Sequence, residues 1–149
     1  MSTVKVYVYD LSHGLARVYA PMMLGISLDA IYHTSVVVYG KEYYIDQGVK
    51  VASTPGTTKY GTPVEVIDMG ETEVPEELFD DYLEEHRNAG KYHPATYDLF
   101  DNNCNHFTDD SLQFLVGQPL VERILTLPQQ VLATPAGQSL RGMLGAQLY

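Results

Sequence analysis

The sequence predicts an α+β domain in which an antiparallel sheet packs against helices. Alternating or β-branched segments bounded by turn residues occupy the first 68 residues, and segments with helical spacing follow from residue 75 onward. A chain of 149 residues that is 45% hydrophobic is long enough to build one domain with its own core. We therefore expect a single domain over residues 1–149.

The predicted strands alternate in side-chain character and are separated by glycine, proline or polar turns. Residues 31–39 are the most strongly β-branched, and Gly40 and Lys41 are expected to return the chain as a hairpin. His33 and Ser35 would then share one face of that strand, and Thr34 the other. The expected strands are residues 4–9, 31–39, 42–46, 47–51 and 63–68, with a Pro/Gly-rich loop over 53–61.

The predicted helices begin and end at capping or breaking residues. Pro75 begins an acidic helix that Gly90 ends, with a buried stripe expected at Leu78, Phe79, Tyr82 and Leu83. The expected helices are residues 15–24, 75–88, a helix that begins near Cys104, short pieces over 120–127 and 128–133, and a final helix over 135–148.

The single cysteine lies where a loop is expected to enter a helix. Asn102 or Asn103 would cap that helix, because a short side-chain carbonyl accepts hydrogen bonds from its first free N–H groups. A thiol in the first turn faces the positive end of the helix dipole, which favours the thiolate. Cys104 is therefore predicted to be a nucleophile. The apolar face after it is expected to comprise Phe107, Ser111, Phe114 and Leu115.

A cysteine nucleophile needs an imidazole that takes its proton and later protonates the leaving amine. His33 lies on a stiff β-branched strand, a rigid mount of the kind that a catalytic base requires. His106 is two residues from Cys104 and would point to another side of the helix. The remaining histidines lie in less constrained positions, where surface, capping or loop roles fit: His13, His86 and His93.

Two segments resemble the PPPDE family, the deSUMOylating-isopeptidase-like cysteine peptidases with a permuted papain-like fold. The first is the strand and hairpin YHTSVVVYGKEYY over residues 32–44, and the second is YDLFDNNCNHF over residues 97–107. The resemblance covers about residues 4–120, and the helices over 119–148 are less diagnostic. It implies an antiparallel sheet or barrel packed against helices, with the histidine preceding the cysteine.

The resemblance implies that His33 and Cys104 are the catalytic pair of an isopeptidase. Its substrates would be conjugates of a ubiquitin-like modifier of the SUMO type, whose tail ends in Gly-Gly. The Cys104 N–H is the natural first oxyanion donor. The candidates for a second donor or a supporting role are Asn102, Asn103 and Tyr97. No metal or other cofactor is expected, and the family resemblance allows a homodimer.

The composition limits the classes of binding partner and the cellular compartment that we expect for this protein. A net charge of -10 argues against binding to nucleic acid or to an anionic membrane. An acidic modifier would need a local basic or apolar patch, for which the candidate cations are Lys41, Lys50, Lys59 and Lys91. One cysteine forms no internal disulfide, and the N-terminal segment has neither a basic region nor a long apolar run. These features predict a cytoplasmic or nuclear protein.

Two other functions remain open at this stage. The same pair of residues would serve a thioesterase that removes fatty acyl (palmitoyl) groups from protein cysteines, and an apolar channel would favour that activity over a tight polar cleft. A non-catalytic adaptor that binds a modifier is the third hypothesis. The presence of both His33 and Cys104 argues against the adaptor, because a binding module has no need of that pair.

Overall fold

The structure is a computed structural model that describes residues 1–26, 30–46, 48–88, 104–127 and 134–135. In these ranges five antiparallel strands form one sheet in the order β4-β3-β2-β1-β5, accompanied by helices, which confirms the predicted α+β class. The strands are β1 (Ser2–Asp10), β2 (Tyr32–Val38), β3 (Lys41–Ile45), β4 (Val49–Ala52) and β5 (Glu65–Thr72). The helices are α1 (Leu15–Leu24), α2 (Glu76–Asn88), α3 (Cys104–Val116) and α4 (Glu122–Leu125).

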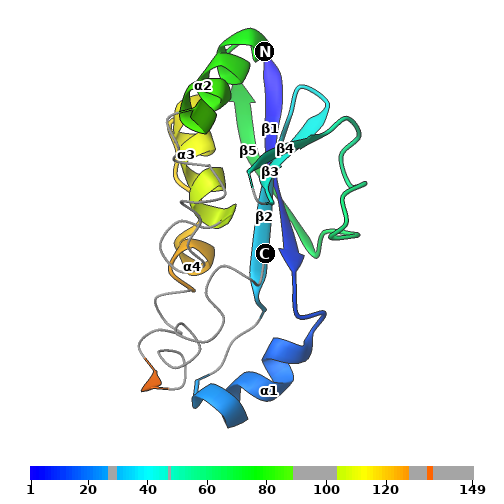
Figure 1. The fold of residues 1–149 in the computed structure, drawn as a ribbon, viewed down its shortest axis with the longest axis vertical. Helices are drawn as coiled ribbons and strands as arrows, with labels where there is room; N and C mark the ends of the chain where they lie inside the picture. Colours follow the sequence, from blue (N-terminus) through cyan, green and yellow to red (C-terminus); the bar gives the residue numbers. More distant parts are fainter. Residues whose placement is uncertain (27–29, 47, 89–103, 128–133, 136–149) are drawn as a thin grey trace.

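The helices α2, α3 and α4 lie along one face of the sheet, and α1 lies at one end of it (Figure 1). The loop between β4 and β5 extends on the other side of the sheet (Figure 1). The main core fills the space between the sheet and α2 and α3. Its fully buried members include Val4, Val6, Val8, Val36, Phe79, Phe107 and Leu112. None of the helices in the described ranges is long and apolar enough to span a membrane.

The strand β2 is buried on both of its faces. On the face toward the helices, Thr34 Oγ1 donates a hydrogen bond to Asn105 Oδ1 of α3 at 2.7 Å and lies 2.9 Å from Thr108 Oγ1. On the opposite face, Ser35 donates to the carboxylate of Glu42 at 2.5 Å. The predicted alternation of His33 and Ser35 against Thr34 is therefore confirmed.

The hairpin between β2 and β3 turns one residue earlier than predicted. Lys41 already pairs with Val38, so Tyr39 and Gly40 are the two residues of the turn. Both have positive φ, 57° and 72°, as a two-residue turn between twisted strands requires. Tyr39 tolerates this conformation with its hydroxyl donating to the Val74 carbonyl at 2.6 Å.

Two predicted positions in the helices are wrong. Leu78 is 53% exposed, although Phe79 and Leu83 of the same predicted stripe are buried. Phe114 is 38% exposed because it stacks on Tyr82 of α2, with ring centroids 4.3 Å apart, instead of packing on the sheet. The buried positions of α3 are Cys104, Asn105, Phe107, Thr108, Ser111, Leu112 and Leu115.

The largest difference between predicted and observed boundaries is in β5. The strand β5 continues to Thr72, past the predicted end at residue 68, and a register shift against β1 accommodates Gly70. The helix α4 falls within the predicted 120–127 segment. The predicted helical segment 128–133 and all but the first residue of 135–148 lie outside the described residues.

Candidate active site

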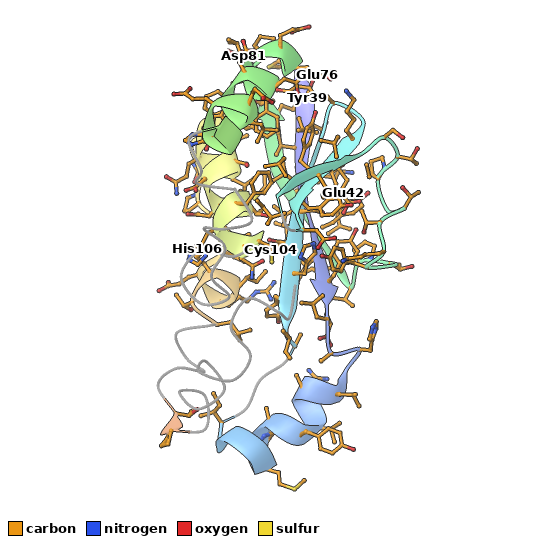
Figure 2. The ribbon with its side chains drawn as sticks, viewed as in Figure 1. Tyr39, Glu42, Glu76, Asp81, Cys104 and His106 are labelled. Carbon is orange, nitrogen blue, oxygen red and sulfur yellow. The ribbon has the colours of Figure 1, made fainter. Side chains whose placement is uncertain are left out.

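Cys104 is the first residue of α3, as predicted, and its side chain is only 1% exposed. It lies at the end of α3 that is nearest to β2, on the side of the helix toward the sheet (Figure 2). His106 lies on the outer side of the same turn (Figure 2), as expected for a residue two positions away. The nucleophile candidate is therefore held between a helix terminus and the central strand.

The start of α3 meets β2 where β3 leaves it. The ladder between β2 and β3 ends at the pair of Val36 and Tyr43. Thr34 lies opposite Val8, whose carbonyl bonds to Val64 on the far side, so the backbone groups of Thr34 point away from β1. The Thr34 N–H instead bonds to the Cys104 sulfur. The first turn of α3 thus takes up the space beside β2 beyond the end of the ladder.

Three side chains fix this junction, and sequence reasoning missed all of them. Asn105 donates from Nδ2 to the Tyr32 carbonyl at 3.1 Å, and its Oδ1 accepts from Thr34 Oγ1 at 2.7 Å. Thr34 Oγ1 also lies 2.9 Å from Thr108 Oγ1, and Thr108 donates to the Cys104 carbonyl at 3.2 Å. The one indication of this junction was that polar residues occupy buried positions of a strand and a helix. Such groups are normally hydrogen-bonded to each other.

His33 is fully buried on β2, next in sequence to the residue whose N–H bonds to the sulfur. Its imidazole stacks on the ring of Tyr60, with centroids 3.8 Å apart and planes 27° apart. Neither ring nitrogen has a hydrogen-bond partner within the described part of the chain. The structure therefore brings the strand of His33 and the sulfur of Cys104 together, and leaves both imidazole nitrogens without a bond to the thiol in this state.

Burial keeps both groups neutral. Desolvation lowers the pKa of His33 to about 3; Asp46 has a smaller effect in the opposite direction, and Lys59 acts in the same direction as burial. Desolvation also raises the pKa of Cys104 to about 12, although N–H groups of Thr34, Asn105 and Cys104 itself act in the other direction. The expected thiolate is therefore not favoured in this structure, because complete burial outweighs the helix terminus. An attack by a neutral thiol would require its proton to move.

A buried carboxylate lies on the His33 face of the sheet. Glu42 is fully buried and accepts hydrogen bonds from the hydroxyls of Tyr9 and Ser35, each at 2.5 Å. Its other oxygen accepts from the Gly56 N–H at 2.8 Å, which ties the 53–61 loop to β3. Three donors satisfy the charge, so the carboxylate serves as an anchor beneath the loop.

The structure describes some of the other predicted site residues and leaves the rest outside the described ranges. Asn102, Asn103 and Tyr97, the candidates for capping and oxyanion roles, lie outside the described residues, as do His93 and Lys91. Two of the candidate cations are ion-paired, Lys41 with Glu76 at 2.6 Å and Lys59 with Asp46 at 2.7 Å. His13 is exposed in a turn, which agrees with the predicted surface position. His86 contacts the Tyr82 ring edge-on, with centroids 4.3 Å apart, and its capping role stays a prediction.

A cysteine at the start of a buried helix, bonded to a central strand that carries a histidine, is the arrangement of a papain-like cysteine peptidase with the two residues in reverse order. The comparisons agree with that class. The profile of the PPPDE putative peptidase domain matches residues 2–145. The chain therefore belongs to the PPPDE peptidase family.

The similar proteins are all of one kind. The chain is 45% identical to desumoylating isopeptidase 1 of Homo sapiens over 141 residues, which cover 95% of this chain and 83% of the relative. The protein of the same name from Rattus norvegicus is also 45% identical, with the same coverage. The protein of that name from Xenopus laevis is 43% identical over the same share of each chain.

Proposed function

We propose that this chain is a thiol isopeptidase that removes a SUMO-type modifier from protein lysines. The observation that carries the proposal is the 45% identity, over 95% of the chain, to a protein named desumoylating isopeptidase 1. The proposal is also supported by the burial of the only cysteine, a candidate nucleophile, against the strand that carries His33, a candidate base.

The reaction would proceed by acyl transfer. The Cys104 sulfur attacks the isopeptide carbonyl while His33 accepts the thiol proton, because both groups are neutral before attack. His33 then gives that proton to the departing lysine amine, and a thioester is left on the sulfur. Water, deprotonated by His33, hydrolyses the thioester, which releases the modifier carboxylate and restores the thiol. The Cys104 N–H at the start of α3 would stabilise the oxyanion in both steps.

The test is a panel of probes that carry a SUMO-type tail, a ubiquitin-type tail or a fatty thioester, offered to the wild type and to the Cys104→Ser and His33→Ala variants. The proposal expects turnover of the SUMO-type probe by the wild type and loss of turnover in both variants. The matched control is His13→Ala, because His13 is exposed in a turn and should leave turnover unchanged. Equal turnover by Cys104→Ser, or hydrolysis of the thioester alone, would contradict the proposal.

We further propose a cytoplasmic or nuclear location and a homodimer, with neither nucleic acid nor membrane among the partners. The single cysteine supports a reducing compartment, and the net charge of -10 supports the exclusion of polyanions. The resemblance to the family supports the dimer. Sedimentation equilibrium of the full chain tests the dimer, and a monomer at all accessible concentrations would rule it out.

A further inference from the structure

The imidazole of His33 is surrounded by aromatic rings from three parts of the chain. Tyr9 of β1 and Tyr44 of β3 lie at centroid distances of 5.8 and 6.1 Å, the first tilted by 48° and the second edge-on at 79°. Tyr60 of the 53–61 loop is much closer, at 3.8 Å and 27°. Tyr60 is therefore the ring among these three that lies against the imidazole plane.

The loop that carries Tyr60 is fastened at two points that precede the ring in the chain. The Gly56 N–H bonds to the buried Glu42 carboxylate at 2.8 Å. Lys59, the residue before Tyr60, forms an ion pair with Asp46 beyond the end of β3 at 2.7 Å. These two anchors restrict the part of the loop that leads into Tyr60, although the loop is rich in glycine and proline.

Among the described residues, no hydrogen bond orients the imidazole. Neither ring nitrogen has a hydrogen-bond partner within the described residues, whereas in a catalytic triad a third residue orients the imidazole by such a bond. The terminal torsion of a histidine has only broad preferences of its own. A face-to-face ring restricts that torsion and leaves both nitrogen edges free for proton transfer.

We propose that Tyr60 is a positioning residue whose ring holds the His33 imidazole in the plane needed for proton transfer to and from Cys104. This inference rests on the proposed catalytic roles of His33 and Cys104. The ring takes the place of the hydrogen-bonding third residue of a triad. Its face also favours the imidazolium that forms during attack, as a cation above a π-system.

The charged groups around His33 do not take over the orientation of the imidazole from the Tyr60 ring. Asp46 and Lys59 act on the imidazole in opposite directions and are paired with each other. Burial raises the pKa of Tyr9, Tyr44 and Tyr60, so that these three hydroxyls stay neutral. Within the described part of the chain, Glu42, which is bonded to Tyr9, and Cys104 of α3 are further titratable groups on this part of the fold.

The test compares Tyr60→Leu with Tyr60→Phe. The Tyr60 hydroxyl has no hydrogen-bond partner among the described residues, so Tyr60→Phe keeps the ring and loses no bond seen there. Turnover of the SUMO-type probe should show kcat reduced about tenfold in Tyr60→Leu, the upper range for an aromatic pair, and kept within about twofold in Tyr60→Phe. KM should change by less than about twofold in both, because Tyr60 is proposed to act on the proton transfer. Equal kcat in Leu and Phe variants, whether both normal or both low, would overturn the proposal.

A second readout separates this proposal from the proposed function. Iodoacetamide alkylates the only cysteine: the Cys104 sulfur forms a bond to the methylene carbon, iodide leaves, and His33 accepts the thiol proton. Alkylation that His33→Ala does not slow would refute the catalytic pair itself. Alkylation slowed by His33→Ala but not by Tyr60→Leu would refute only the role of Tyr60. Tyr60→Met, with its thermal unfolding measured beside the others, conserves apolar volume and should behave as Tyr60→Leu does.

Discussion

Acid should destabilise this protein partly through His33. The imidazole is fully buried, and desolvation lowers its pKa to about 3 in the folded chain, whereas an unfolded histidine has a pKa near 6.5. Between these two values the unfolded chain binds a proton that the folded chain does not. Protonation of His33 therefore costs the fold no stability above a pH of about 6.5, and the free energy of unfolding decreases as the pH falls from there toward about 3.

The linkage relation sets the size of the effect. Lowering the pH from about 7 to about 4.5 protonates His33 almost fully in the unfolded chain and hardly at all in the folded chain. The free energy of unfolding should then fall by about 2–3 kcal/mol through this one residue. Such a loss is a large share of the roughly 5–15 kcal/mol that stabilises a typical domain.

Urea unfolding of wild type and His33→Phe at both pH values provides the assay. The phenyl ring keeps the stack with Tyr60 but does not titrate, and all other ionisable groups are common to both proteins, so their contributions cancel. The difference in pH dependence between the two proteins should be about 2–3 kcal/mol. A His33→Phe variant that loses as much stability in acid as the wild type would refute the argument that burial holds the imidazole neutral.

Urea unfolding also tests three contacts of the fold. Glu42→Ala leaves the buried hydroxyls of Tyr9 and Ser35 without their acceptor and should cost about 3 kcal/mol, and a cost below about 1 kcal/mol would contradict this. Thr34→Val removes the hydroxyl contacts of Thr34 with Asn105 and Thr108 and should cost about 2 kcal/mol while also changing the rate of Cys104 alkylation; an unchanged rate would show that the Thr34 hydroxyl does not position the sulfur. Arg123→Ala breaks a pair with Glu65 whose side chains are 49% and 42% exposed, and it should cost less than about 1 kcal/mol.

Local pattern was enough to predict most strands and helices of the described chain. Alternating valines predicted β1, and a β-branched run between turn residues predicted β2, because these patterns follow directly from the period of the backbone. The start of α3 at Cys104 was also predictable from the sequence. The end of β5 was not, because Gly70 and its neighbours resemble a turn unless the bulge against β1 is known.

The site was predictable only in part. His33 and Cys104 could be picked out from residue type, local mount and the resemblance of two motifs. Their surroundings could not, since Thr34, Asn105 and Thr108 become one hydrogen-bonded junction only when α3 docks on β2. The same holds for Phe114, whose exposure depends on α2 lying beside it and not on its place in the helix.

The protonation state of the pair shows most clearly what tertiary structure adds. From the sequence alone, a helix terminus indicated a thiolate, because that effect is local and acts within one turn. Burial of Cys104 and His33 depends on strands and loops far apart in the chain, and desolvation of a charge is the larger energy. The residues and their chemistry can thus be read from the sequence, whereas their charge and their orienting neighbour, Tyr60, follow from how the chain packs.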